Sequence, residues 1–366
     1  MSFTPSTRSQ LITRRTYSRP LADTPGPNQD LYLAQGYEYE PWEETCSRVI
    51  EHQKWLWERA QGHRLTIEQD NELAALYRLF EDRKALPSGR TLWLGGTPVS
   101  KRREATQFNC SFCRVETVHD VVDAFWLLLQ GCGVGFEPIM GTLSGFTAPV
   151  TVEVRSKPKE HRREENRGSV SSDAYKLEIG DSAEAWAKSI GKLLAMKHRV
   201  SRVILDFSNI RPAGIRLKGY GWISSGYEPL AQALEAICEL LSKRAGQLLS
   251  RIDILDILNH LGTTLSSRRS AEIALVPYGD PEWLDFARAK KDHWIDKPHR
   301  AQSNNSLLFY NKPSKGDLYD IFEEIEKNGG SEPGFINAQA ALKRAPWFKG
   351  VNPCAEILLG NRSFCK

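Results

Sequence analysis

The chain has 366 residues, of which 40% are hydrophobic and 26% are charged. This composition is typical of a globular protein with about two average domains or one large barrel. The formal net charge of +4 does not indicate a nucleic-acid or membrane partner. Residues 1–20 lack the apolar core of a secretory signal, and the apolar runs are too short to span a bilayer. The sequence therefore predicts a cytoplasmic protein with reduced thiols.

The first part of the chain is polar and then helical. Residues 1–40 are rich in Pro, Thr and Arg, which is typical of an extended arm. Apolar residues recur at helical spacing over 44–60 and again over 66–86, where Thr66 is placed to cap the second helix. "LPSGRTLWLGGTP" interrupts this pattern with Pro and Gly and predicts a short strand. We therefore predict an N-terminal arm and helical region over residues 1–88.

From about residue 95 onward, predicted strands alternate with predicted helices. The helical segments are 118–130, 182–198, 226–246, 252–262 and 315–330. The strand segments are 148–156, 202–210, 271–278 and 304–311. Glycines predict a tight turn in "GCGVGFEP", and mixed charge predicts a solvated loop in "KPKEHRREENRG". The alternation predicts an α/β architecture with largely parallel strands over residues 89–366.

The chain has seven cysteines, which in an intracellular protein indicate structural, catalytic or metal-binding thiols. They are Cys46, Cys110, Cys113, Cys132, Cys238, Cys354 and Cys365. Two of them, Cys46 and Cys238, lie among apolar residues in helical patterns. We expect both to be buried as small hydrophobic side chains.

"NPCAE" places an amide, a thiol and a carboxylate at alternate positions. Asn352 precedes a proline, which favours extended backbone. In an extended segment Asn352, Cys354 and Glu356 would point to one side, about 7 Å apart along the chain. That arrangement suits sulfur chemistry and proton transfer on one small molecule. The alternative is a loop with a capping asparagine and an incidental cysteine.

Zinc binding is a competing interpretation of the thiols. "CSFC" places Cys110 and Cys113 in a CxxC pair, and Cys354 with Cys365 could supply two further ligands. Zinc sites usually combine two close pairs, however, and the second pair here is widely spaced. The spacing therefore disfavours zinc.

Two further motifs have weak signals. "GCGVGF" lacks the GxGxxG spacing of a dinucleotide loop, so we interpret it as a tight turn in which Cys132 has no chemical role. "SSRRS" places Arg268 and Arg269 together between a helix and a strand. Paired arginines suit a phosphate, and the alternative is a surface loop with two solvated side chains.

Several segments, in their order along the chain, carry a family resemblance. They are "RTYSRPL", "PSGRTLWLGGTP", "FNCSFC", "GCGVGFE", "ILDFSNIRPAGIRLKGYG", "RRSAEIAL", "SNNSL", "SEPGFIN" and "NPCAEILL". The chain resembles the N-terminal half of an adenosylcobalamin-dependent (class II) ribonucleotide reductase, of the monomeric ribonucleoside-triphosphate reductase type. The resemblance implies the first part of a ten-stranded α/β barrel, built from two parallel five-stranded halves around a central finger loop.

The resemblance also implies a role for each residue of the closing stretch. Cys354 would carry a thiyl radical generated with adenosylcobalamin and would remove the 3′ hydrogen of the substrate. Glu356 would accept the 3′-hydroxyl proton, and Asn352 would orient the substrate and Glu356. Cys110 and Cys365 would deliver the reducing equivalents and end as a disulfide. Cys113 is an alternative partner, but the family motif aligns on Cys110.

Other implied contacts concern substrate and effector. The implied substrate-binding residues are Ser88, Asn109 and Gly133. Arg268 and Arg269 match a loop that links effector to substrate specificity, and an insertion around residues 150–200 would build the effector site. The implied partners are a ribonucleotide substrate, a deoxynucleotide effector and a thioredoxin-like reductant, with no nucleic acid and no membrane.

In this family the chain continues well beyond the second reducing cysteine. We therefore expect the remaining half of the barrel, with most cobalamin contacts, to come from a companion C-terminal fragment of a split or intein-interrupted enzyme. Two alternatives remain open. One is a non-catalytic nucleotide-binding or assembly subunit of a reductase, and the other is a reductase with a different radical source.

Overall fold

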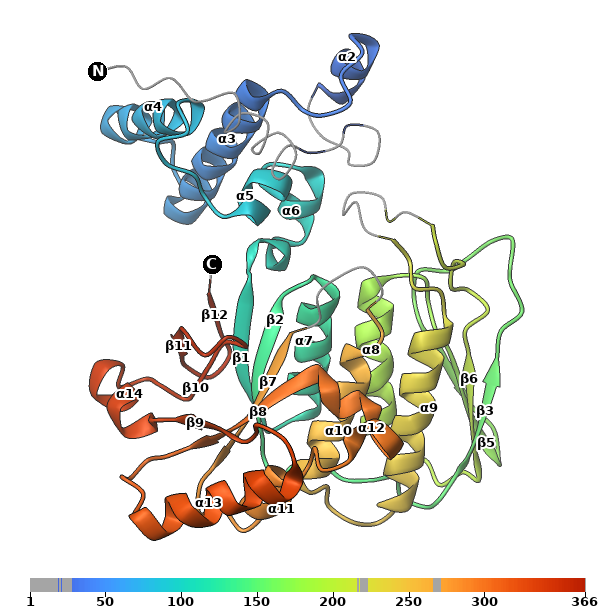
Figure 1. Cartoon of the computed structure of the whole chain (residues 1–366). Helices are drawn as coiled ribbons and strands as arrows, with labels where there is room; N and C mark the ends of the chain where they lie inside the picture. The colour runs from blue at the N-terminus through green and yellow to red at the C-terminus, as the bar shows by residue number, and fades with distance from the viewer. Residues whose placement is uncertain are drawn as a thin grey trace. The chain divides into compact units, whose positions relative to one another are not determined.

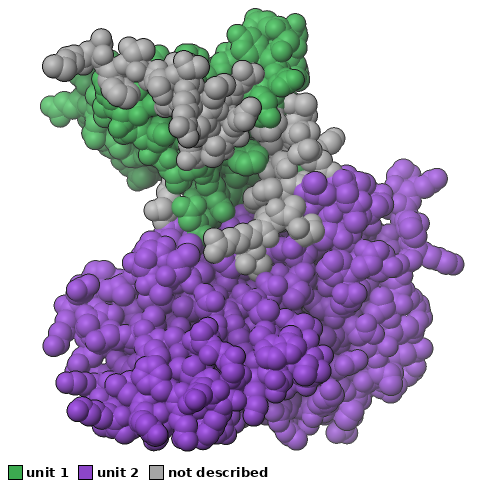
Figure 2. All heavy atoms as spheres, in the orientation of Figure 1, with its two compact units in different colours: residues 1–109, 216–222, 366 green, residues 110–215, 223–365 purple. Residues whose placement is uncertain are grey.

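The computed structural model describes residues 19, 21, 28–215, 217, 223–265 and 271–365. The chain divides into two compact units, which Figure 2 shows in different colours. Unit 1 comprises residues 1–109, 216–222 and 366, and unit 2 comprises residues 110–215 and 223–365. None of the helices in the described part of the chain has the length and apolar character needed to cross a bilayer.

Unit 1 is helical. Its elements are α2 (Gln29–Ala34), α3 (Trp42–Gln61), α4 (Ile67–Glu81), α5 (Gly89–Leu94), α6 (Pro98–Arg102) and the 3₁₀ helix η1 (Glu104–Gln107). The predicted Thr66 cap is confirmed, because its hydroxyl accepts from the Gln69 N–H and the Gln69 side chain accepts from the Thr66 N–H. Cys46 is fully buried, as predicted.

The strand predicted in "LPSGRTLWLGGTP" is wrong, because this segment forms the short helix α5 and leads into the short helix α6 at Pro98. Ser88 caps α5, accepting a hydrogen bond from the Thr91 N–H at 3.4 Å. Thr97 caps α6, whose first residue is Pro98. Ser and Thr caps, and Pro in the first turn, start helices, and these signals outweigh the glycines.

A six-stranded sheet forms the centre of unit 2 (Figure 1). Its order is β12 (Ser363–Cys365), β1 (Cys110–Val115), β2 (Gly133–Pro138), β7 (Glu272–Pro277), β8 (Ser303–Leu308) and β9 (Gly334–Ile336). Strands β1, β2, β7, β8 and β9 pair in parallel, and β12 pairs antiparallel to β1. This confirms the predicted α/β architecture with largely parallel strands. The turn predicted over "GCGVGFEP" is confined to its start, where Gly131 has φ of 79°, and the residues from Gly133 onward form the buried strand β2.

A second sheet has four strands, β3 (Thr151–Arg155), β6 (Arg202–Asp206), β5 (Ala174–Glu178) and β4 (Arg167–Val170) in that order. Between the two sheets lie helices α7 (Val118–Leu129), α8 (Ala183–Leu194), α9 (Glu228–Lys243) and α10 (Arg251–Gly262) (Figure 1). Each of these helices was predicted from its apolar spacing. Cys238 lies in α9 and is fully buried, as expected.

The rest of unit 2 is made of short elements and one longer helix. They are α11 (Trp283–Ala287), α12 (His293–Asp296), η2 (Pro298–Gln302), α13 (Lys315–Asn328), α14 (Ala338–Arg344), β10 (Gly350–Val351) and β11 (Leu358–Leu359). Strands β10 and β11 form an antiparallel hairpin. Its side chains Val351 and Leu359 share a buried cluster with Phe112, Ile273 and Leu275 of the central sheet. The hairpin therefore packs directly on that sheet.

A carboxylic acid is buried at the first residue of β7. Glu272 is 2% exposed. Its Oε2 accepts a hydrogen bond from Asn259 Nδ2 at 2.8 Å, whereas its Oε1 has no partner among the described residues. Burial raises the pKa of Glu272 to about 8, outweighing the effect of Asn259. Inside the fold this carboxyl is therefore largely protonated at neutral pH.

We expect Glu272→Gln to flatten the pH dependence of the free energy of unfolding. In the unfolded chain the carboxyl has a pKa near 4.5, and in the folded chain it keeps its proton until about pH 8. Between these pH values only the unfolded state loses the proton, so the free energy of unfolding falls as the pH rises. The fall is at most about 5 kcal/mol, and glutamine has no such proton to lose. Urea unfolding across this pH range measures the slope. Glu160→Gln, a change at an exposed glutamate, is the control, and a slope unchanged by Glu272→Gln contradicts the expectation.

Candidate active site

The "NPCAE" segment forms the tight turn of the β10–β11 hairpin. The Ala355 N–H donates to the Asn352 carbonyl at 2.8 Å, and the Ile357 N–H donates to Asn352 Oδ1 at 2.9 Å. Ala355 has a left-handed backbone with φ of 62°. The extended conformation considered from the sequence is therefore wrong, because the Asn352 side chain closes the turn. Asn352 is fully buried, whereas Cys354 and Glu356 are exposed.

Cys110 and Cys365 lie directly opposite one another in the antiparallel pair β1–β12. Such partners have Cα atoms about 4.5–5.5 Å apart, within the range that a disulfide spans. Burial, the Cys110 thiol and Glu356 raise the pKa of Cys365 to about 11, so its sulfur is protonated at neutral pH. Both residues are thiols in the structure. The two sulfurs could form a disulfide without any change of strand register.

Asn352 joins the turn to this thiol pair. Its Nδ2 lies 3.7 Å from Cys110 Sγ, although the two residues are 242 positions apart in the sequence. Glu356 is close enough for its charge to act on Cys365. The structure thus brings together Asn352, Glu356, Cys110 and Cys365, and Cys354 lies at the exposed tip of the same turn.

Glycines in the central sheet allow the hairpin to pack closely on it, and the sequence analysis did not predict this role. A Cβ atom on Gly133 would lie 2.9 Å from the ring of Pro353. A Cβ atom on Gly135 would overlap the carbonyl oxygen of Val351. Both glycines lie in β2, so the "GVGF" part of "GCGVGF" is a strand that the hairpin backbone crosses closely. The predicted substrate residue Gly133 therefore lies against the turn that carries Cys354.

A third glycine completes this close packing from the hairpin side. A Cβ atom on Gly350 of β10 would overlap the ring of Phe112, which is 1% exposed in β1. In the sequence this contact is marked only by Gly350 preceding the apolar Val351. That pattern is too common to predict that a hairpin crosses a sheet closely. The aromatic ring and the missing side chain together fix how near the hairpin lies to the sheet.

The remaining predicted residues are Ser88, Asn109, Arg268 and Arg269. Ser88 and Asn109 belong to unit 1, where the Ser88 hydroxyl caps α5 and lies 3.0 Å from Thr91 Oγ1. Asn109 immediately precedes Cys110 and is half-buried. Arg268 and Arg269 lie outside the described residues.

The described residues contain no group of three or more His, Cys, Asp or Glu side chains placed to hold a metal ion. Cys110 and Cys113 are three positions apart in β1, so their side chains point to opposite faces of the sheet. Cys113 is buried, and burial raises its pKa to about 12. The CxxC pair is therefore not arranged as two ligands of one zinc ion.

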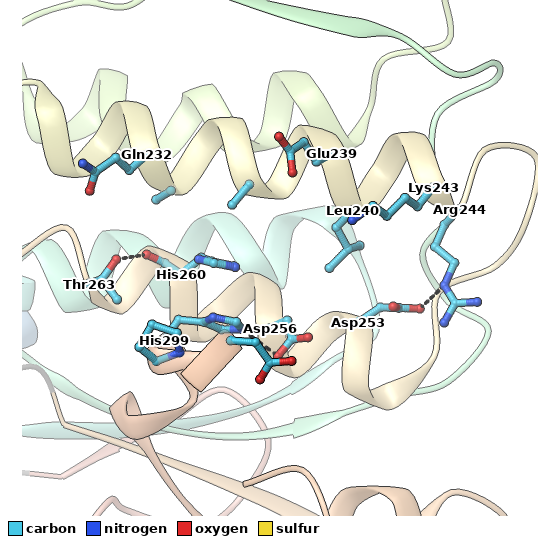
Figure 3. A pocket seen from close by; sticks show the side chains of 14 residues that line it. Gln232, Glu239, Leu240, Lys243, Arg244, Asp253, Asp256, His260, Thr263 and His299 are labelled. Carbon is cyan, nitrogen blue, oxygen red and sulfur yellow. Dashed lines mark hydrogen bonds and ion pairs between the residues drawn. The ribbon is translucent and has the colours of Figure 1, made fainter. Parts of the chain in front are cut away.

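A groove of about 760 Å³ lies between α9 and α10, away from these residues (Figure 3). His260 and His299 stack there with ring centroids 3.8 Å apart, and Asp256 Oδ1 lies 2.9 Å from His299 Nε2. Burial, together with His299, lowers the pKa of His260 to about 4, so this imidazole is neutral at pH 7. None of the predicted site residues in the described part of the chain lines the groove. The groove is separate from the candidate active site.

Comparisons with known proteins agree with the resemblance. The family model described as "B12-dependent ribonucleotide reductase, insertion domain" matches residues 151–241. Adenosylcobalamin-dependent ribonucleoside-triphosphate reductases of Lactobacillus acidophilus and Lactobacillus gasseri are 29% and 30% identical, over 96% of this chain and 53% of theirs. The enzyme of Lactobacillus leichmannii is 28% identical over 96% of this chain and 52% of its own.

A solved structure shares the fold. The crystal structure of a B12-dependent (class II) ribonucleotide reductase superposes with a TM-score of 0.76 at 25% identity, covering 96% of this chain and 54% of that one. The chain spans about half the length of the curated relatives that it matches. The chain is thus similar, over nearly its whole length, to about half of an adenosylcobalamin-dependent, class II ribonucleotide reductase, as its motifs predicted.

Proposed function

We propose that this chain carries the thiol chemistry of an adenosylcobalamin-dependent reductase that converts ribonucleoside triphosphates to 2′-deoxyribonucleotides. The observation that carries the proposal is the pairing of Cys110 with Cys365 on adjacent strands, with Asn352 of the "NPCAE" turn bound to Cys110. A thiol pair ready to form a disulfide, beside a turn with an exposed thiol and a carboxylate, suits a reduction that consumes two thiols.

Each residue has a proposed role. Cys354 would become a thiyl radical, remove the 3′ hydrogen atom and return it at the end of the cycle, and Glu356 would accept the 3′-hydroxyl proton and give it back when the 3′-hydroxyl re-forms. The 2′-hydroxyl would leave as water while Cys110 and Cys365 lose two electrons and two protons and form one S–S bond. Asn352, held by Ile357 and Cys110, would keep the turn and the thiol pair in contact.

The cofactor named for the relatives, adenosylcobalamin, would supply the radical that removes the Cys354 thiol hydrogen. The fit rests on Cys354 itself, which lies exposed at the tip of a turn, while Cys113 and Cys238 are buried. An exposed thiol is accessible to a cofactor held largely by other parts of the enzyme. We propose that most cobalamin contacts come from the half of the reductase that has no counterpart in this chain.

We further propose that a companion polypeptide, in a split or intein-interrupted enzyme, completes the barrel next to β9. Strand β9 is at one edge of the central sheet, and the aromatic side chains Tyr319, Phe322 and Phe335 are exposed on β9 and the neighbouring α13. Phe322 and Phe335 are in contact, with ring centroids 5.5 Å apart. An open edge beside exposed aromatic rings is a surface that proteins normally cover.

Regulation and re-reduction complete the proposal. The matched insertion, residues 151–241, would build a deoxynucleotide effector site, with Arg268 and Arg269 linking it to the substrate. Ser88, Asn109 and Gly133 would contact the substrate, and a thioredoxin-like protein would reduce the disulfide in the cytoplasm.

The test of the proposed function combines the chain with its companion, adenosylcobalamin, a dithiol and a ribonucleoside triphosphate, and measures the deoxynucleotide formed. No product from the complete mixture would contradict the proposal.

We expect Cys110→Ser and Cys365→Ser each to stop multiple turnover with a dithiol while leaving Cys354 able to form its radical. Either serine removes one of the two sulfurs that the disulfide needs. Steady-state product formation measures the loss, and electron paramagnetic resonance of the freeze-quenched mixture measures the radical. Cys113→Ser is the matched control, because Cys113 is in the same strand but faces the opposite side. If only Cys113→Ser loses turnover, Cys110 is not the partner of Cys365 in the reducing pair, and Cys113 takes its place.

A further inference from the structure

The turn that joins β11 to β12 is tied to the sheet by two side chains. Asn361 Oδ1 accepts a hydrogen bond from the Arg114 N–H of β1 at 2.8 Å. Arg362 Nε donates to Asp120 Oδ1 of α7 at 2.8 Å. Arg362 has a left-handed backbone with φ of 53°, so the turn is held in a conformation that few residues prefer. Neither contact involves a thiol, yet both lie just before Cys365.

The Asn361 contact continues the strand pairing. Strand β12 pairs with β1 as Cys110–Cys365, Ser111–Phe364 and Phe112–Ser363. Two positions further along the same register, Asn361 stands opposite Arg114. Its side-chain oxygen thus accepts the hydrogen bond that a strand carbonyl would accept in a longer ladder. A shift of β12 by one residue would break this bond.

The Arg362 contact ends on a buried carboxylate. The Asp120 side chain is 1% exposed. Its Oδ2 accepts from the Thr117 N–H and hydroxyl and from the Glu116 N–H, as part of the cap of α7. Burial would raise the pKa of Asp120, but the bonds from Arg362 and Thr117 hold it below its usual value. Arg362 is therefore attached to a carboxylate that the helix cap already holds in place.

Strand β12 itself is short. It has three residues, so its backbone pairing with β1 alone provides few hydrogen bonds to fix the register. Because side chains alternate across a strand, a one-residue slip would turn Cys365 to the opposite face and place it opposite a neighbour of Cys110. Whether Cys365 faces Cys110 therefore depends on contacts outside the strand.

We propose that Asn361 and Arg362 are positioning residues that hold β12 in the register in which Cys365 faces Cys110. The inference rests on the proposed function of these cysteines as the reducing pair. On oxidation the two thiols lose two electrons and two protons and form one S–S bond; in the proposed reaction the ribonucleotide accepts the electrons. Fixing the register raises the effective concentration of one thiol at the other, which favours the disulfide.

The test measures the disulfide equilibrium in the chain itself. Parent and the double variant Asn361→Ala/Arg362→Ala are equilibrated in glutathione buffers, where oxidised glutathione accepts the two electrons and becomes two reduced molecules. After alkylation, peptide mass spectrometry gives the fraction of the Cys110–Cys365 disulfide. We expect the double variant to lower the equilibrium constant about tenfold, or about 30 mV. The variant Asn361→Ala/Arg362→Lys keeps the positive charge at position 362, so its equilibrium constant should lie between those of the double alanine variant and the parent.

Controls separate positioning from a general structural role. Arg344→Gln, at an exposed arginine of α14, should leave the equilibrium unchanged. The melting temperature of the reduced double variant should stay close to that of the reduced parent. A disulfide equilibrium constant equal to that of the parent overturns the inference, whether or not the melting temperature is lower. If the parent forms no Cys110–Cys365 disulfide at any glutathione ratio, the reducing pair itself is wrong, and the inference falls with it.

Discussion

Cys354→Ser is expected to abolish deoxynucleotide formation by the complete reductase, by a factor of about a thousand or more. That loss corresponds to ~4 kcal/mol of activation free energy. The O–H bond of serine is much stronger than the S–H bond of cysteine, so the variant cannot give up a hydrogen atom on the proposed path. The measurement is product formation with the companion, adenosylcobalamin, a dithiol and a ribonucleoside triphosphate.

The position of Cys354 makes this variant easy to interpret. The side chain is exposed at the tip of the turn, so an oxygen in place of sulfur should disturb no buried packing. With oxidised glutathione as the electron acceptor, disulfide formation between Cys110 and Cys365 should therefore be the same in the variant and the parent. Turnover above about a tenth of the parent rate would remove Cys354 from the proposed mechanism. Loss of both turnover and disulfide formation would instead indicate a damaged fold.

The longer helices could be predicted from the sequence because their apolar periodicity is a local signal, whereas the short helices α5 and α6 were not predicted. Thr66 and Ser182 cap helices whose apolar residues recur at helical spacing, and both helices form as expected. Burial of Cys46 and Cys238 followed from the same spacing. These predictions needed only the residues of one segment, which is why they were correct.

The glycine-rich segments were misread because their signals are not local. "GCGVGF" was interpreted as a turn, but from Gly133 onward it is a strand whose glycines Gly133 and Gly135 make room for the hairpin. That hairpin lies more than two hundred residues later, so nothing near the glycines indicates it. The alternating residues of "NPCAE" likewise suggested an extended segment, but the Asn352 side chain folds it into a turn.

The candidate site was predicted in part through the family resemblance. The resemblance paired Cys110 with Cys365, and the structure places them on adjacent strands in direct register. Residue chemistry alone left zinc and an incidental loop as alternatives. The anchors at Asn361 and Arg362 were not predicted, because their partners Arg114 and Asp120 are distant in sequence. Assigned roles for the site residues remain predictions.

Gly135→Ala is expected to destabilise unit 2 by about 3 kcal/mol and to lower reductase activity about a hundredfold. The new methyl group would overlap the carbonyl oxygen of Val351, so the hairpin that carries Cys354 must move away from the sheet. A displacement of about 1 Å at reacting groups is enough for such a loss of rate. Urea unfolding of the chain and turnover of the complete enzyme measure the two effects.

Two other glycines make this prediction specific. Gly330→Ala is the matched control, because no atom lies within 4 Å of the added methyl group, and it should change neither quantity. Gly350→Ala should also destabilise the chain, but its clash is with the Phe112 ring, so Phe112→Leu in the same chain should recover part of the loss. Phe112→Leu should not rescue Gly135→Ala, whose severest clash is with backbone. If Gly135→Ala behaves like Gly330→Ala, the hairpin does not depend on the close crossing.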